Sequence, residues 1–280
     1  MNKDAHTILL NIRDIHLFYV PAALEQATGL LNLLPIESNN FKALLTHSLR
    51  QRIFTLMRDS LQSFTSNPEG GYFTTSVLTR LIMETGSVII LMSRDNTDQF
   101  LSDYLQDAQT YSKSRLHDLN RMISCLDLDV ATAALNETGQ AQNIINALDA
   151  LRQQQTLPPP RKYPKMLERC RRISKKWEFF YHATYRELSE NAHGQLTKIM
   201  HPLGLALASS NQGEALFYEH SRAMNYAFMF WGSTMVEVLE GHISDKELDP
   251  FKELYSTALQ TASEAAESFN PDNLAHSFRV

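Results

Sequence analysis

Arg186 and His193, near the end of the segment YHATYRELSENAHG, are the residues of this chain best suited to chemistry. A guanidinium group holds a phosphate through its planar set of donors, and an imidazole transfers a proton near neutral pH. Neither step needs a metal ion or a cofactor. The pair therefore predicts a metal-independent ribonuclease site, with both residues as catalytic groups.

A helix through this segment would present one polar stripe. At about 100° per residue, the stripe collects His182, Arg186, Ser189 and His193, with Tyr185 and Glu190 flanking it as supporting residues. The opposite side should face the core and carries Trp177, Phe180, Tyr181, Thr184 and Leu188. Arg186 and His193 would then lie roughly 10 Å apart along the helix axis, a gap that their side chains could largely close around a phosphodiester.

Spacing alone does not establish this site. With 16 arginines and 10 histidines in 280 residues, chance gives about one to two arginines followed by a histidine at four to six intervening positions. A polar stripe is also the usual solvated face of a surface helix. The structural alternative for Arg186 and His193 therefore stays open.

A concentration of positive charge precedes the stripe. Residues 161–176 hold eight basic residues and one acid, which gives this segment a charge of +7 in a chain with a net charge of −5. Such charge suits a phosphate backbone, although a solvated helix face or an acidic partner segment would explain it equally. The predicted RNA-binding residues are Arg161, Lys162, Lys165, Arg169, Arg171, Arg172, Lys175 and Lys176.

Arg80 and Glu84 are one helical turn apart in an otherwise apolar segment. Charges in such a context are costly unless they are paired. An ion pair within the helix explains them. The functional alternative is that Glu84 orients Arg186 or His193 as a supporting carboxylate.

Composition narrows the function classes. The hydrophobic content of 43% is ample for a core, and the net charge of −5 gives no global sign of nucleic-acid binding. Cys125 and Cys170 are too few for a disulfide framework or a structural zinc site. The sequence contains no histidines or cysteines spaced as metal ligands, no phosphate-binding loop and no glycine-rich turn that would bind a dinucleotide. Its apolar segments are too short or too interrupted to predict a membrane span. The expectation is a cytoplasmic protein without metal or cofactor.

Apolar periodicity and scarce glycine and proline predict an all-α fold of roughly eight to ten helices. Helices are expected near 9–19, 21–34, 45–64, 74–93, 97–123, 214–239 and 249–268, with one or two weaker helices over 127–155 and one kinked helix or two over 165–193. The prolines 158–160 predict an extended segment. The prediction is one domain over 1–280, made of N-terminal helices in 1–70, a core bundle from 72–126 and 165–241, a polar, proline-rich connector at 138–164 and a C-terminal helix at 247–268.

Two patterns resemble those of known helical proteins. Tyr185, Leu188, Ser189 and His193 match the Y-x-x-L-S-x-x-x-H pattern of a group of little-characterised bacterial helical proteins, and Arg80 with Glu84 matches an Arg-x-x-x-Glu pair in an earlier helix of that group. More distantly, Arg186 and His193 are similar to the signature of the HEPN superfamily, an arginine and a histidine separated by four to six residues. Glu187 departs from that signature, which usually has Asn, Asp or His after the arginine.

The HEPN resemblance implies a HEPN-like helical core and a metal-independent RNA-cleaving site, often formed across a homodimer. It also implies a toxin–antitoxin or phage-defence setting with an inhibitory or defence-system partner protein. The first hypothesis is thus an RNA endonuclease that leaves a 2′,3′-cyclic phosphate. The alternative is a non-catalytic helical module that binds a protein, nucleotide or nucleic acid, and a membrane-surface protein ranks last.

Overall fold

The computed structural model describes residues 5–34, 40–123, 128–186, 188–189 and 212–267. These residues confirm the predicted all-α fold, since they contain no strand beyond one isolated bridge between Glu240 and Ile243. The α-helices are α1 (Ala5–Asn32), α2 (Phe41–Ser66), α3 (Tyr72–Arg94), α4 (Gln99–Ile123), α5 (Leu128–Gln154), α6 (Met166–Ile173), α7 (Lys175–Phe180), α10 (Gln212–Leu239) and α11 (Asp245–Glu267). A π-helical turn, η1 (Tyr181–Tyr185), follows α7 directly.

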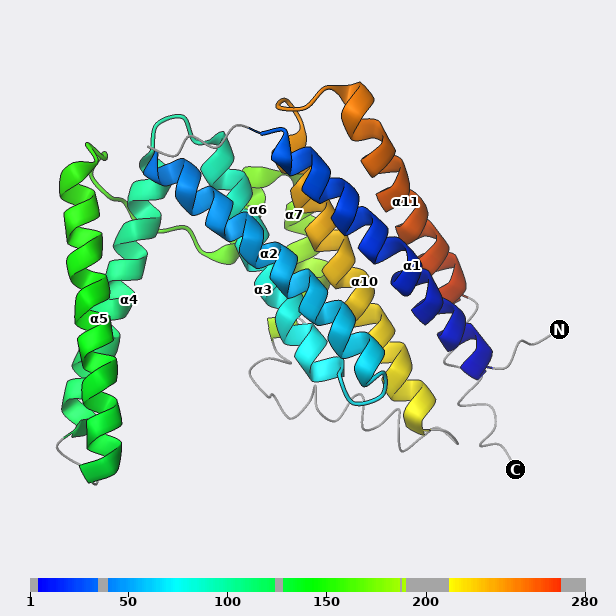
Figure 1. The fold of residues 1–280 in the computed structure, drawn as a ribbon, viewed down its shortest axis with the longest axis horizontal. Helices are drawn as coiled ribbons and strands as arrows, with labels where there is room; N and C mark the ends of the chain where they lie inside the picture. Colours follow the sequence, from blue (N-terminus) through cyan, green and yellow to red (C-terminus); the bar gives the residue numbers. More distant parts are fainter. Residues whose placement is uncertain (1–4, 35–39, 124–127, 187, 190–211, 268–280) are drawn as a thin grey trace. The chain divides into compact units, whose positions relative to one another are not determined.

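The chain divides into two compact units, residues 1–90 with 166–280, and residues 91–165. The boundary at residue 90 falls inside α3, where no break was predicted, whereas the boundary at residue 165 follows the predicted connector. In the first unit α1 packs against α2, α10 and α11, and α10 also contacts α2 and α11 (Figure 1). Helix α10 is therefore the central element of this bundle.

Aromatic side chains on α10 explain its central place. Trp231 is fully buried and lies edge-on to Phe54 of α2 and to Phe251 of α11, with ring centroids 5.4 and 5.9 Å away. Phe230, one residue earlier, meets Phe180 of α7 at 5.4 Å. Each large buried ring contributes roughly 2–3 kcal/mol by its removal from water. This core fixes the position of the chain that leads into η1.

Helix α3 approaches α10 closely. A Cβ atom built on Gly86 would lie 2.2 Å from the Thr234 hydroxyl oxygen, so only glycine fits at this crossing. Nearer the start of α3, the Thr79 hydroxyl donates to the Ala223 carbonyl at 3.1 Å. Tyr72–Arg94 is also, within the described chain, the one helix long and apolar enough to span a membrane by length and composition, and 72% of its most apolar window is buried in the fold.

The predicted helix end before Pro21 is wrong, because α1 continues through it from Ala5 to Asn32. A proline inside a helix removes one backbone hydrogen bond and crowds the preceding turn. Pro21 is exposed, whereas its neighbours Val20 and Ala23 are completely buried. Burial of the apolar face thus outweighs the local cost of the proline.

In the second unit α4 and α5 run side by side (Figure 1). The segment predicted as a connector, 138–164, is helical as far as Gln154 and extended at the prolines. Side chains of α4 bond this extended chain: the Ser102 hydroxyl donates to the Pro158 carbonyl at 2.6 Å, and the Asp103 carboxylate accepts the Arg161 backbone N–H at 2.6 Å. Proline has no backbone N–H to donate, so this segment cannot form the backbone hydrogen bonds of a helix. The side chains of Ser102 and Asp103 bond its polar backbone groups instead.

Candidate functional site

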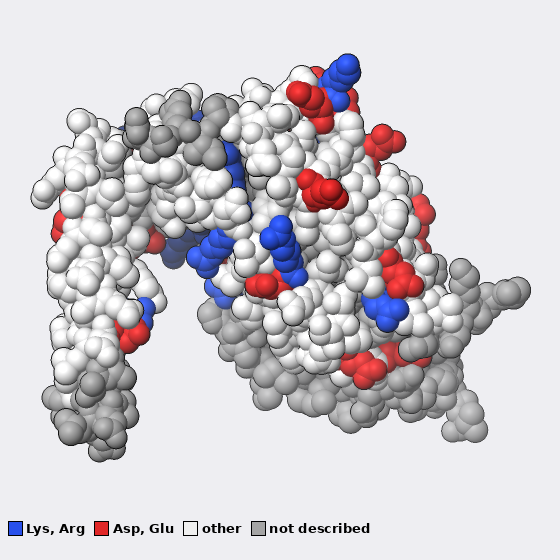
Figure 2. Space-filling view, viewed as in Figure 1, with Lys and Arg blue, Asp and Glu red and all other residues white. Residues whose placement is uncertain are grey.

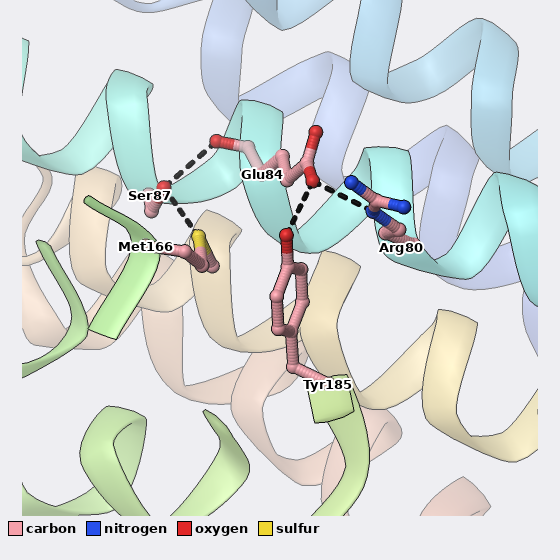
Figure 3. A network of polar contacts seen from close by, with 5 residues as sticks. All are labelled: Arg80, Glu84, Ser87, Met166 and Tyr185. Carbon is pink, nitrogen blue, oxygen red and sulfur yellow. Dashed lines mark hydrogen bonds and ion pairs between the residues drawn. The ribbon is translucent and has the colours of Figure 1, made fainter. Parts of the chain in front are cut away.

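A polar network joins α3 to the segment that carries Arg186 (Figure 3). Arg80 Nε donates to Glu84 Oε1 at 2.8 Å, and the Tyr185 hydroxyl donates to the same oxygen at 2.6 Å. The Arg80 guanidinium carbon also lies 5.7 Å from the centre of the Tyr185 ring. One carboxylate oxygen of Glu84 thus accepts two hydrogen bonds. One of the donors, Tyr185, lies 101 positions from Glu84 in the sequence.

The network is only partly exposed. The side chains of Arg80 and Glu84 are 23% and 27% exposed, and Tyr185 is 8% exposed. Burial and the hydrogen bond to Glu84 raise the pKa of Tyr185 to about 12, so the phenol keeps its proton and acts as a donor. Burial opposes the charge on Arg80, but Glu84 and Tyr185 outweigh it and raise the pKa of Arg80. The three groups therefore form a satisfied unit.

The prediction that Arg80 and Glu84 pair within α3 agrees with this geometry. The supporting role expected for Glu84 is not observed toward Arg186, and toward His193 it lies outside the described residues. Glu84 reaches the motif segment through Tyr185, the residue immediately before Arg186, and makes no hydrogen bond to Arg186 within the described chain. Sequence reasoning placed Tyr185 beside the polar stripe but did not identify it as the partner of Glu84.

The π-helical turn explains the position of Tyr185. The backbone N–H of Arg186 donates to the Tyr181 carbonyl, an i to i−5 bond. A π-turn winds less tightly than an α-helix, so residues that follow its start advance less around the axis. Tyr185 consequently moves from the expected edge of the core face into the core, and its ring stacks on that of Tyr181 at 5.2 Å. Single π-turns of this kind are frequent at functional sites.

A break at Ser174 sets the start of this segment. The Ser174 hydroxyl accepts the Trp177 backbone N–H at 3.3 Å and caps α7. Of the two predicted forms of 165–193, one kinked helix or two, the structure has the divided one here. Trp177 and Phe180 are then buried, and Thr184 and Leu188 continue the same apolar side. The predicted core-facing side of the segment is therefore observed.

The polar side is observed in part. His182 and Arg186 are exposed, and Ser189 is half-buried. His193, Glu190 and Glu187 lie outside the described residues. Arg186 thus stands on the surface one residue after a buried, hydrogen-bonded tyrosine.

The basic residues of 161–176 differ in exposure. Arg169 is buried at 9%, so it does not offer its charge to solvent as expected of an RNA-binding residue. The other seven are exposed: Arg161, Lys162, Lys165, Arg171, Arg172, Lys175 and Lys176. The first three belong to the second unit and the last four to the first.

Carboxylates balance part of this charge in the first unit. Glu178 accepts from Arg171 at 2.8 Å and from Lys175 at 2.9 Å, and Glu168 pairs with Arg172. The two basic partners lower the pKa of Glu178 to about 2. On the viewed face of the α1, α2, α10 and α11 bundle, basic and acidic side chains are scattered over a largely uncharged surface (Figure 2).

Metal ligands do not cluster in the part of the chain that the structure describes, where no group of three or more His, Cys, Asp or Glu side chains could hold an ion. Cys170 is buried, and burial raises the pKa of its thiol to about 12, which disfavours a nucleophilic thiolate. The described side chains therefore offer acid–base and phosphate-binding chemistry through Arg186 and His182.

Comparison of the chain with models of protein families, with curated proteins and with solved structures found no match.

Proposed function

We propose that this protein is a metal-independent RNA endonuclease of the HEPN type, with Arg186 and His193 as its catalytic residues. The observation that supports the proposal is the placement of Arg186. Its side chain is exposed directly after a π-helical turn, and the preceding Tyr185 is held by Glu84. An arginine fixed at its backbone and free at its guanidinium is suited to binding a phosphate in a defined orientation.

In the proposed reaction His193 accepts the proton of a ribose 2′-hydroxyl. The 2′-oxygen attacks phosphorus, the bond from phosphorus to the 5′-oxygen breaks, and the leaving oxygen takes a proton from the imidazolium of His193 or from water. Arg186 stabilises the negative charge that develops on the phosphoryl oxygens. The products are a 2′,3′-cyclic phosphate and a 5′-hydroxyl, and no metal ion takes part.

In each unit by itself, exposed basic residues of 161–176 would contact a strand through its phosphates: Arg161, Lys162 and Lys165 in the second unit, and Arg171, Arg172, Lys175 and Lys176 in the first. The family resemblance extends the proposal to a cytoplasmic protein that acts as a homodimer, in a toxin or phage-defence setting with an inhibitory partner. These elements depend on the resemblance and not on the geometry around Arg186.

The decisive experiment follows cleavage of a 5′-labelled single-stranded RNA in EDTA by the wild type and by Arg186→Gln, His193→Ala and Arg52→Gln. Arg52 is an exposed arginine of α2 and provides the matched control. Each catalytic substitution should slow cleavage by at least about 100-fold, and Arg52→Gln should retain it. Identical RNA patterns for the wild type and His193→Ala would overturn the proposal.

The charge pairs of the first unit favour a second candidate, a non-catalytic helical module that binds a partner. Glu178 and Glu168 already neutralise Arg171, Arg172 and Lys175 in part, which reduces the surface charge available to a nucleic acid. Under this candidate His193→Ala changes stability or partner binding and no turnover exists to be lost. Lost cleavage with an unchanged unfolding curve would exclude it.

A further inference from the structure

The groove between α1 and α2 contains a second cationic site, remote in sequence from Arg186. A cavity of about 80 Å³ lies between the two helices. Its polar lining comes from Thr28 and Asn32 of α1 and from His47, Arg50, Gln51 and Arg58 of α2. This volume is that of two to three waters, or of one small oxyanion.

Arg50 is the most informative of these side chains. Its Nε is buried and has no hydrogen-bond partner. Burial also lowers the pKa of Arg50, because it removes hydration from the charged guanidinium group. Arg50 also lines the cavity, so a ligand that accepts from its guanidinium group would compensate a charge that the described fold leaves unpaired.

The cavity has no balancing acid among its described lining residues. Neither Arg50 nor Arg58 forms an ion pair within the described chain, and none of the residues that line the cavity is acidic. The C-terminal end of α1 contributes a partial negative charge of about half a unit. Two full guanidinium charges exceed it, so the cavity favours an anion.

An apolar groove adjoins this cavity. It has a volume of about 450 Å³, shares Thr28 and Arg58 with the cavity, and is otherwise lined by Pro21, Leu24, Glu25 and Leu61. Glu25 is exposed and is its one acidic lining residue. A ligand whose anionic end binds Arg50 and Arg58 can therefore extend an apolar part over Leu24 and Leu61.

We propose that the α1/α2 groove binds a small phosphate monoester, with its phosphate between Arg50 and Arg58 and its apolar substituent in the adjoining groove. A phosphate matches the planar donor sets of two arginines, and its size matches the enclosed cavity. The site is independent of the proposed RNA cleavage, because none of its residues belongs to the Arg186 segment.

Isothermal titration calorimetry at constant ionic strength tests this site with inorganic phosphate and with hexyl phosphate. Hexyl phosphate should bind at least about tenfold more tightly, because several methylene groups leave water. Arg58→Gln should weaken both ligands by roughly 10- to 100-fold through loss of a charged hydrogen bond. Arg58 is exposed, so this variant should retain the native far-UV circular dichroism spectrum.

Arg50→Gln is the second variant, and Arg52→Gln on the same helix is the matched control, with the same change of charge at an exposed position. Loss of binding in both cavity variants with retention in the control supports the site. An equal loss in Arg52→Gln, or no saturable binding by the wild type, would overturn it. Equal affinities for the two phosphates would overturn the assignment of the apolar groove to the same ligand.

Discussion

Helix α3 carries two polar clusters, and they differ in charge and in depth. Near its start, Thr75 and His220 are completely buried and bond each other at 2.6 Å, and His220 Nδ1 lies 2.9 Å from the Pro68 carbonyl. Since a carbonyl can only accept, Nδ1 carries the proton and Nε2 accepts from the threonine hydroxyl. Farther along, the charged groups Arg80 and Glu84 remain about a quarter exposed.

The difference follows from the cost of desolvation. A neutral imidazole with both nitrogens bonded can be buried completely, whereas burial of two full charges removes more hydration than their attraction returns. Helix α3 therefore places its neutral cluster against α10 and its ion pair at an accessible edge, where Tyr185 covers it. The Thr75–His220 cluster holds α3 against α10, whereas Arg80 and Glu84 connect α3 to Tyr185, next to Arg186.

The largest expected effect comes from buried histidines and is a loss of folding stability at acidic pH. Burial lowers the pKa of both His220 and His16 from 6.5 to about 4. Because the folded-state values lie below the unfolded value, the stability they contribute is complete above pH 6.5 and is lost as the pH falls toward 4. Each histidine should account for up to about 3 kcal/mol.

Urea unfolding between pH 7 and pH 4.5 measures this loss, and NMR titration of the imidazole protons assigns it to individual histidines. A native-state resonance of His220 that titrates near pH 6.5 would contradict the neutral character given to the first cluster. The same result for His16, a buried residue of α1, would contradict its neutral state.

The second prediction tests how tightly the neutral cluster is packed. Gly71→Ala would place a Cβ 2.5 Å from His220 Cε1 and 2.9 Å from the Asn67 carbonyl oxygen. Backbone and a buried ring cannot both move away, so unfolding should require about 2 kcal/mol less free energy. Gly29→Ala has no atom within 4 Å of its Cβ and should stabilise α1 by about 0.5–1 kcal/mol. Equal results for the two variants in urea unfolding would show that the cluster tolerates repacking.

The fold could be predicted largely from sequence because apolar periodicity is a strong signal over 20 or more residues. Single prolines were less reliable as signals of where a helix ends. Pro21 failed to end α1 because tertiary burial outweighed it, whereas the prolines at 158–160, with no apolar periodicity around them, did exclude helix. The two units could not be separated from sequence, because the first of their two boundaries falls inside the continuous helix α3.

The candidate site was predictable in composition but not in geometry. The Arg80 and Glu84 pair follows from spacing alone, since residues four apart meet on a helix. The hydrogen bond from Tyr185 does not, because it depends on a π-turn that a regular helical wheel does not contain. Arg50 and Arg58 share a helix face, but their unpaired state depends on which residues of α1 lie opposite.

The third prediction concerns the charged cluster. Tyr185→Phe removes one hydrogen bond to Glu84 and leaves the Arg80 bond in place, so the free energy of unfolding should fall by about 1 kcal/mol. Tyr181→Phe is the matched control, because the Tyr181 hydroxyl makes no hydrogen bond in the described part of the chain. A loss as large for Tyr181→Phe would mean that the stacked rings, and not Glu84, hold η1 in place.

The smallest effect is expected at Arg186 itself. Its side chain is exposed and has no partner among the described residues, so Arg186→Gln should change the free energy of unfolding by less than about 0.5 kcal/mol. In a double-mutant cycle with Tyr185→Phe, measured by urea unfolding, the two effects should add within about 0.3–0.5 kcal/mol. A coupling above about 1 kcal/mol would place Arg186 within the structural network of Glu84. Additive effects would instead show that Arg186 does not stabilise this network, which leaves its guanidinium group available to bind a phosphate.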